Sequence, residues 1–134
     1  MRILLLGVNH KTVPLDVREA ASFSKSKVIE ALPALQGIAG EAVVLSTCNR
    51  TEIYVTTSEK KVSPRIERFL SDFHSLPSET LSPHLIESLD DDAVRHLFKV
   101  ASGLDFLIIG AFEILRQVRD PLTIASDAES LPLI

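Results

Sequence analysis

The sequence predicts an α+β domain in which a ferredoxin-like, split βαβ arrangement with an antiparallel sheet is followed by C-terminal helices. Three observations support this prediction. The composition is that of a globular protein, strand and helix patterns follow the order strand, helix, strand, strand, helix, strand, and no internal repeat interrupts them. Of the 134 residues 46% are hydrophobic and 24% are charged, which is enough apolar material to bury one core.

Four segments are expected to form the strands of this sheet. Residues 3–8 are a continuous apolar run, and residues 41–46 repeat the pattern, as strands buried on both faces do. Residues 53–57 are rich in β-branched side chains, which favour strands. Residues 84–88 carry a weaker pattern of the same kind and are predicted to be a short fourth strand.

Two helices are expected between these strands. Residues 24–36 have apolar side chains at helical spacing after a serine cap at 24 or 26, although Pro33 should kink or end this helix early. The second helix begins at Ser63, a capping residue, followed by Pro64 in the first turn. Its apolar residues fall on one face: Val62, Ile66, Phe69, Leu70 and Phe73. Residues 76–83 are expected to be a loop.

The C-terminal part is expected to be helical. Asp90 to Asp92 can cap the start of a helix that extends to Ala101 and supply favourable negative charge. Its predicted buried stripe is Val94, Leu97, Phe98 and Ala101. A further helix is expected over residues 110–120, where Pro121 ends it. Residues 121–134 show no clear period and are predicted to be a separate tail.

Charge and cysteine content restrict the setting in which the protein works. The net charge is −4, so the domain as a whole does not attract nucleic acid, and any RNA contact has to be local. The densest basic stretch, residues 60–68, is preceded by Glu59 and interrupted by Glu67, and it is interpreted as a solvated helix face. No apolar run is long enough to cross a membrane, and no signal-peptide pattern is found. One cysteine cannot form an internal disulfide, which favours a cytoplasmic location.

The segment with the clearest chemical signal is VVLSTCNRTEIY, residues 43–54. An apolar strand gives way to polar residues 46–52 before the next strand is expected to begin, and Cys48 lies among them. A lone cysteine is most often a small buried hydrophobic residue, but such a thiol would lie inside the apolar run rather than beyond its end. Because strand ends hold side chains rigidly and accessibly, and because Arg50 favours a thiolate, Cys48 is predicted to be a reactive nucleophile.

Other common sites are absent from the sequence. None of the four histidines is spaced with another or with Cys48 as zinc ligands are, so a zinc site is not expected. The chain has neither a G-x-G-x-x-G fingerprint nor a Walker loop, so this domain is not expected to bind a cofactor. From spacing alone His96 is interpreted as exposed, because it shares a helix side with Arg95 and Lys99.

Three motifs in this order resemble the N-terminal catalytic domain of the glutamyl-tRNA reductases, the first enzymes of the C5 route to tetrapyrroles. They are GVNHKTVPLDVRE at residues 7–19, LSTCNRTEIY at 45–54 and HLFKVASGLD at 96–105. The resemblance covers residues 1–120 and therefore most of the chain.

The resemblance implies a thiol-dependent reduction. Cys48 would attack the ester that joins glutamate to tRNA and form a thioester, which NADPH, held by a separate Rossmann domain, would reduce to glutamate-1-semialdehyde. It implies that His96 has a role in activity, whereas spacing alone indicates an exposed histidine on a solvated helix side. It also implies substrate contacts by Thr47, Asn49, Arg50 and Gln117, with the guanidinium suited to the glutamyl side-chain carboxylate. Glutamyl-tRNA is the expected partner. NADPH-binding and dimerisation domains are expected in a longer parent chain, which leaves a homodimer open.

The chain departs from the family pattern after its last motif. Phe106 stands where the family has a serine, Ala111 where it has a glutamate that holds the substrate, and Arg116 where it has glycine. Glu113 could replace the lost acceptor. These changes keep a second hypothesis open, in which the protein is a degenerate, non-catalytic relative that binds tRNA or a protein. A third, a plain thiol hydrolase, depends on Cys48 alone.

Overall fold

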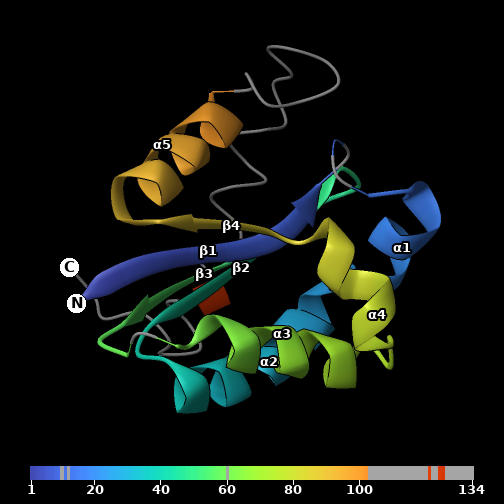
Figure 1. Cartoon of the computed structure of the whole chain (residues 1–134), viewed down its shortest axis with the longest axis horizontal. Coiled ribbons are helices and arrows are strands. Elements are labelled where there is room, and N and C mark those ends of the chain that lie inside the picture. The colour runs from blue at the N-terminus through green and yellow to red at the C-terminus, as the bar shows by residue number, and fades with distance from the viewer. Residues whose placement is uncertain (10, 12, 60, 103–120, 122–123, 126–134) are drawn as a thin grey trace.

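The chain folds around a four-stranded antiparallel sheet (Figure 1), seen in a computed structural model that describes residues 1–9, 11, 13–59, 61–102, 121 and 124–125. The strands are β1 (Arg2–Asn9), β2 (Ala42–Ser46), β3 (Arg50–Thr57) and β4 (Ile86–Leu89). The helices are α1 (Leu15–Ala20), α2 (Lys25–Ile38), α3 (Ser63–Phe73), α4 (Ser78–Leu81) and α5 (Asp90–Ala101), with a 3₁₀ turn, η1, at Ser82–His84. The predicted α+β class is confirmed.

The order of the strands is that of a split βαβ fold. It runs β2-β3-β1-β4, and every neighbouring pair is antiparallel. The chain passes from β1 through α1 and α2 to β2, and β3 then returns between these two strands. The predicted ferredoxin-like antiparallel sheet is therefore confirmed.

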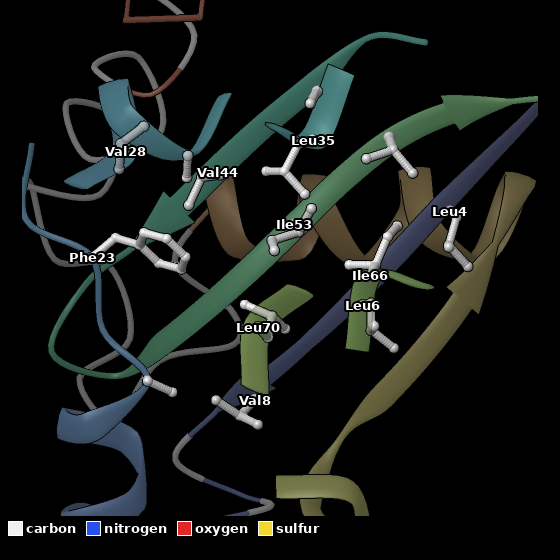
Figure 2. Close-up of a cluster of buried hydrophobic side chains, with 14 of the residues drawn as sticks. Leu4, Leu6, Val8, Phe23, Val28, Leu35, Val44, Ile53, Ile66 and Leu70 are labelled. Carbon is white, nitrogen blue, oxygen red and sulfur yellow. The ribbon is translucent and has the colours of Figure 1, made fainter. Parts of the chain in front are cut away.

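One face of the sheet carries the hydrophobic core. Side chains alternate along a strand, so Leu4, Leu6 and Val8 of β1 point to the same face as Ile53 of β3. Figure 2 shows them packed against apolar side chains from the two helices on this face, α2 and α3. These helix residues are Val28, Ala31, Leu32, Leu35, Ile66 and Leu70.

The helix α2 continues through Pro33, so the prediction of an early end was wrong. Pro33 lies on the exposed side of the helix, whereas the residues on the opposite side are fully buried. The carbonyl that loses its donor belongs to Ile29, whose side chain is 50% exposed. Tertiary packing of the buried side therefore outweighs the lost hydrogen bond. The predicted cap is confirmed, since the Ser24 hydroxyl accepts from the backbone N–H of Lys27.

The helix α3 keeps its predicted apolar face but not its predicted cap. Ser63 is already helical, and its hydroxyl donates to Oε2 of Glu87 at 2.8 Å instead of capping the helix. The segment predicted as a loop, residues 76–83, contains α4 and most of η1. It is ordered in this way because Leu81 is buried in the core.

The helix α5 lies on the other face of the sheet (Figure 1). The side it buries differs from the predicted one. Its buried residues are Ala93 and Val100, whereas Phe98 is 70% exposed. The prediction placed Phe98 inside and His96 outside, and the structure reverses both. Helical spacing alone could not identify the side of α5 that faces the sheet. That side contains Ala93, which is small, and His96, which is polar, so it looks less apolar than the side with Phe98.

The acidic start of α5 ties the helix to β1. Its N-cap, Leu89, makes no side-chain cap, so the predicted capping by aspartate was wrong. Asp90 instead accepts from the backbone N–H of Ile3 at 3.0 Å and from Nε of Arg2 at 3.3 Å. The hydrogen bond from Ile3 holds the pKa of Asp90 below its usual value. The predicted negative charge in the first turn is present.

Within the described ranges no helix has both the length and the apolar character that a membrane span requires. The helix predicted over residues 110–120 lies outside the described residues, as does most of the tail predicted at 121–134.

Candidate active site at the β2–β3 hairpin

The strand β3 begins at Arg50 rather than at residue 53 as predicted, which makes the hairpin tight. The backbone N–H of Thr47 donates to the carbonyl of Arg50 at 2.8 Å, leaving Cys48 and Asn49 at the tip. The hydroxyl of Thr47 accepts from the N–H of Asn49 at 3.2 Å. The Cys48 side chain is exposed. A short hairpin closed in this way presents the thiol to solvent on a rigid support.

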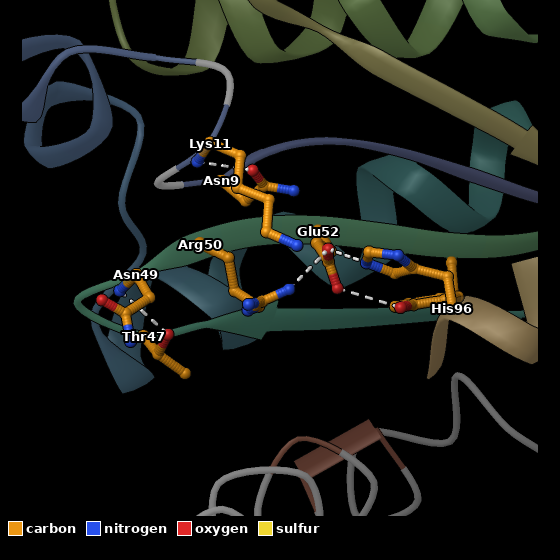
Figure 3. Close-up of polar contacts among 8 residues, drawn as sticks. Asn9, Lys11, Thr47, Asn49, Arg50, Glu52 and His96 are labelled. Atoms are coloured by element: carbon orange, nitrogen blue, oxygen red, sulfur yellow. Dashed lines mark hydrogen bonds and ion pairs between the residues drawn. The ribbon is translucent and has the colours of Figure 1, made fainter. Parts of the chain in front are cut away.

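A buried ionic cluster lies directly behind this tip. Alternation along β3 places Arg50, Glu52 and Tyr54 on the face of the sheet opposite the core. Nη1 of Arg50 lies 3.3 Å from Oε2 of Glu52, and the hydroxyl of Tyr54 donates to Oε1 at 2.9 Å (Figure 3). Both charged side chains are fully buried. A buried carboxylate requires several donors of this kind to offset its loss of hydration.

His96 of α5 completes the cluster. Its Nε2 lies 2.5 Å from Oε2 of Glu52, and its side chain is only 17% exposed. Because Arg50 and Tyr54 both donate to Glu52, this side chain is an acceptor, and we assign the imidazole proton in the contact to Nε2. Nδ1 is then left as the acceptor of the ring. Glu52 thus sets the orientation and tautomer of His96.

Glu52 was not among the residues singled out from the sequence. The signal that could have found it is its position two residues after Arg50, which puts both side chains on one face of a strand. That signal is visible only if β3 is taken to begin at Arg50. The predicted strand began at residue 53, so Arg50 and Glu52 were placed before it.

Gly7 of β1 provides room for the cluster. It pairs with Glu52 across the sheet. A Cβ atom on Gly7 would lie 2.3 Å from the carbonyl oxygen of Thr51 and 2.8 Å from Cα of Glu52, so no side chain fits there. The glycine that opens the first sequence motif therefore leaves room for Glu52 of the second.

A cavity of about 330 Å³ opens beside Cys48. Its lining comes from α1, the α1–α2 connection and the hairpin: Arg18, Glu19, Ser22, Phe23, Ser24, Ser46, Thr47 and Cys48. The backbone N–H of Phe23 donates to the hydroxyl of Ser46 at 2.9 Å, and that hydroxyl lies 3.2 Å from the hydroxyl of Thr51. These bonds join the connection to the base of the hairpin and hold the cavity in place beside the thiol.

Comparison with known proteins identifies the family. The glutamyl-tRNA(Glu) reductase N-terminal domain family matches residues 6–133. The chain belongs to this family. The match also extends through residues 121–133, beyond the last of the three motifs.

Individual relatives agree with this assignment. The glutamyl-tRNA reductases of Hydrogenovibrio crunogenus and Herpetosiphon aurantiacus are 41% and 38% identical to the chain over 133 and 131 residues. Each alignment covers 98% of this chain but only 30% or 32% of the relative. The structure of glutamyl-tRNA reductase from Methanopyrus kandleri matches with a TM-score of 0.77 and 28% identity, over 97% of this chain and 29% of that one. The chain thus spans about a third of the length of these reductases.

The reductase-family residues predicted to form the site fall into two groups. Thr47, Cys48 and Asn49 form the hairpin tip, whereas Arg50 and His96 belong to the buried cluster (Figure 3). His96 therefore lies against the sheet, and the interpretation of a solvated histidine was wrong. Gln117 and the altered positions 106, 111, 113 and 116 lie outside the described residues. Among the residues that are described, no group of three histidine, cysteine or acidic side chains could hold a metal ion.

Proposed function

We propose that this chain is the acylation domain of a glutamyl-tRNA reductase, in which Cys48 takes the glutamyl group from tRNA as a thioester. The observation that carries the proposal is an exposed thiol on a rigid hairpin tip, directly in front of a buried ionic cluster, in a member of this family. A thiol is the side chain that forms such an acyl intermediate most readily near neutral pH.

The proposed reaction is a transfer between two acyl carriers. Sγ of Cys48 attacks the ester carbonyl carbon, a bond forms from sulfur to carbon, and the bond from carbon to the terminal ribose oxygen breaks. The thiol proton ends on that oxygen, so the step needs neither oxidant nor reductant. His96 is retained as a proposed catalytic residue on the resemblance alone, since Arg50 and Glu52 lie between its ring and the hairpin tip (Figure 3).

Substrate contacts are assigned to the residues around the thiol. Thr47 and Asn49 flank Cys48 at the tip and offer a hydroxyl and an amide to the glutamyl group. Arg50 is retained as a proposed contact for the side-chain carboxylate on the resemblance alone, because its guanidinium is fully buried and pairs with Glu52. Gln117 is retained as a proposed contact on the resemblance alone.

Reduction of the thioester is not assigned to residues of this chain. The sequence has no glycine-rich dinucleotide-binding loop, so NADPH does not fit this domain. In a full-length reductase the hydride would come from the remaining two thirds of the chain, and the product would be glutamate-1-semialdehyde for tetrapyrrole synthesis. The proposal for the present domain is limited to binding and acylation.

The test uses glutamyl-tRNA that is radiolabelled in the glutamate. The protein should become labelled without any added nucleotide cofactor, and hydroxylamine should release the label, as it does from thioesters. Cys48→Ser, which keeps the size of the side chain, should abolish labelling. Equal deacylation by the wild type and by Cys48→Ser would overturn the proposal. Tight binding of tRNA without labelling of the protein would instead support the second hypothesis, a non-catalytic relative that binds tRNA.

A further inference from the structure

The hydroxyl of Ser46 connects the hairpin that carries Cys48 to a segment distant in the sequence. Ser46 is the last residue of β2 and lies two positions before the thiol. Its Oγ accepts from the backbone N–H of Phe23 at 2.9 Å and lies 3.2 Å from Oγ1 of Thr51, its partner across the hairpin. A serine hydroxyl can accept one hydrogen bond and donate another, so it serves both contacts at once. The base of the hairpin is therefore joined to the α1–α2 connection, 23 positions away in the sequence.

The Phe23 end of this connection is fixed in the hydrophobic core. The side chain of Phe23 is 7% exposed, and its ring stacks on the ring of Phe73 in α3 with centroids 5.2 Å apart. The ring of His74 packs against it edge to face, with centroids 4.4 Å apart. Figure 2 shows Phe23 among the core side chains beside β2. Because protein interiors are close-packed, such a ring has little freedom to move, and the N–H that Ser46 binds is a fixed point outside the hairpin.

The two strands of the hairpin differ in the support that they receive from the sheet. The ladder between β3 and β1 extends to Arg50, at the edge of the tip. In the described part of the chain β2 lies at an edge of the sheet, with β3 as its neighbour on one side. The bonds of Thr47 and Asn49 fix the shape of the tip but not its place relative to the domain. The Ser46 hydroxyl supplies, at the end of the edge strand, the support that a second neighbouring strand would give.

From these contacts we propose that Ser46 is a positioning residue for Cys48, an inference that rests on the proposed function. Attack on an ester requires Sγ to approach the carbonyl carbon from a narrow range of directions, so a small displacement of the tip slows acyl transfer. A small alkylating reagent meets an exposed thiol from many sides and needs no such orientation. Loss of the Ser46 hydroxyl therefore slows acylation of Cys48 and leaves its alkylation unchanged.

The test measures both reactions in Ser46→Ala and in the wild type, as rates per folded molecule. With labelled glutamyl-tRNA, the maximal rate of acylation should fall about tenfold in the variant, since a misplaced reacting group costs this much or more. The half-saturating concentration of glutamyl-tRNA and the rate of alkylation by iodoacetamide should match the wild type. Ser46→Thr, which keeps the hydroxyl, should recover most of the lost rate. Thermal unfolding establishes that each variant is folded.

Ser71→Ala is the matched control. Its hydroxyl also joins a helix to a backbone group, because it donates to the carbonyl of Leu76, and Ser71 is 8% exposed. It belongs to α3 and makes none of the hairpin contacts. Ser71→Ala should lower the unfolding temperature and leave the acylation rate per folded molecule unchanged. Equal slowing of acylation by Ser71→Ala and Ser46→Ala would assign the effect to general loosening of the fold and overturn the inference.

The position of the tip can also be measured without any substrate. Cys48 is the one cysteine of the chain, so a nitroxide attached to it reports on the tip alone. Its electron paramagnetic resonance spectrum should show faster motion in Ser46→Ala than in the wild type, in Ser46→Thr and in Ser71→Ala. Identical spectra for all four proteins would overturn the inference, as would equal slowing of acylation and alkylation in Ser46→Ala.

Failure of the proposed function gives a different result. The wild-type protein would then not be acylated at all, whereas the nitroxide spectra would still decide whether the Ser46 hydroxyl holds the tip. Acylation of the wild type with an unchanged maximal rate in Ser46→Ala would reject the positioning role alone.

Discussion

The two faces of the sheet differ in chemistry although one strand supplies both. Glu52 and Ile53 are neighbours in β3, and both are fully buried. Ile53 lies among apolar side chains from α2 and α3, whereas Glu52 contacts Arg50, Tyr54 and His96 (Figures 2 and 3). Burial of the first kind stabilises a fold, and burial of charged groups is seldom a net gain. The difference teaches that the core face holds the domain together, whereas the opposite face holds the buried ionic cluster behind the candidate site.

The largest effect is expected on the polar face. Glu52→Ala leaves the buried guanidinium of Arg50 without its carboxylate and removes the support of His96, so the free energy of unfolding should fall by about 3–5 kcal/mol. Acylation of Cys48 should fall as well. Urea denaturation and the labelling assay measure the two effects. Adding Arg50→Ala should cost less than the sum of the single changes, and strict additivity would contradict a coupled pair.

The neighbouring position on the core face should separate stability from activity. Ile53→Ala should lower the free energy of unfolding by about 3 kcal/mol, because it leaves a cavity in the core. The acylation rate per folded molecule should not change, since no member of the cluster is touched. Ile53→Val should cost about 1 kcal/mol. A large loss of activity in folded Ile53→Val would mean that the two faces are not independent.

Gly7→Ala tests the room that β1 leaves for the cluster. The added methyl group meets the carbonyl of Thr51 and the backbone of Glu52, so the free energy of unfolding should fall by about 2 kcal/mol and acylation should slow. Gly37→Ala in α2 is the matched control, because a Cβ there meets no atom within 4 Å. It should stabilise the helix by about 0.5–1 kcal/mol. If Gly7→Ala and Gly37→Ala changed the free energy of unfolding by similar amounts, the close contact of Gly7 with Thr51 and Glu52 would not be the cause of the effect.

His74 adds a pH dependence to the core face. Its ring packs against Phe23 and Phe73, with centroids 4.4 and 5.2 Å away, and burial, followed by the charge of Lys27, lowers its pKa from 6.5 to about 4. Because the pKa is lower in the folded state, this contribution to stability is complete above pH 6.5 and is lost as the pH falls toward 4.

His74→Phe should remove that contribution. The fall in unfolding free energy between pH 7 and pH 4 should be smaller in the variant by about 1–2 kcal/mol, a range that allows for solvent screening. Denaturation at several pH values measures the two slopes. Parallel curves for the variant and the wild type would show that His74 does not titrate in this range.

The smallest effect on stability is expected at Phe98 of α5, which was predicted to be buried and is exposed in the structure. Phe98→Ser should change the free energy of unfolding by no more than about 0.5 kcal/mol, because the ring is 70% exposed. Val100→Ala, two residues along the same helix, should cost about 2 kcal/mol, since Val100 is fully buried. The reverse ranking would restore the stripe predicted from spacing.

The sequence by itself determined the fold class and pointed to a candidate nucleophile. Apolar runs mark the strands, helical spacing marks α2 and α3, and their order leaves few ways to cover an antiparallel sheet. Cys48 was predicted to be a nucleophile because a thiol among polar residues at a strand end is out of place for a core residue, and the structure shows its side chain exposed. The motifs around it led to the reductase family, which the comparisons then confirmed.

Only the tertiary structure decided which polar residues are buried. Local patterns treat Arg50 and Glu52 as turn residues and His96 as a surface residue, because a polar group in isolation belongs in water. The structure buries Arg50 and Glu52 and partly buries His96, since Glu52 receives donors from its own strand and from a helix 44 positions away in the sequence. Partners distant in sequence, which no local pattern contains, determine where a charge can be buried.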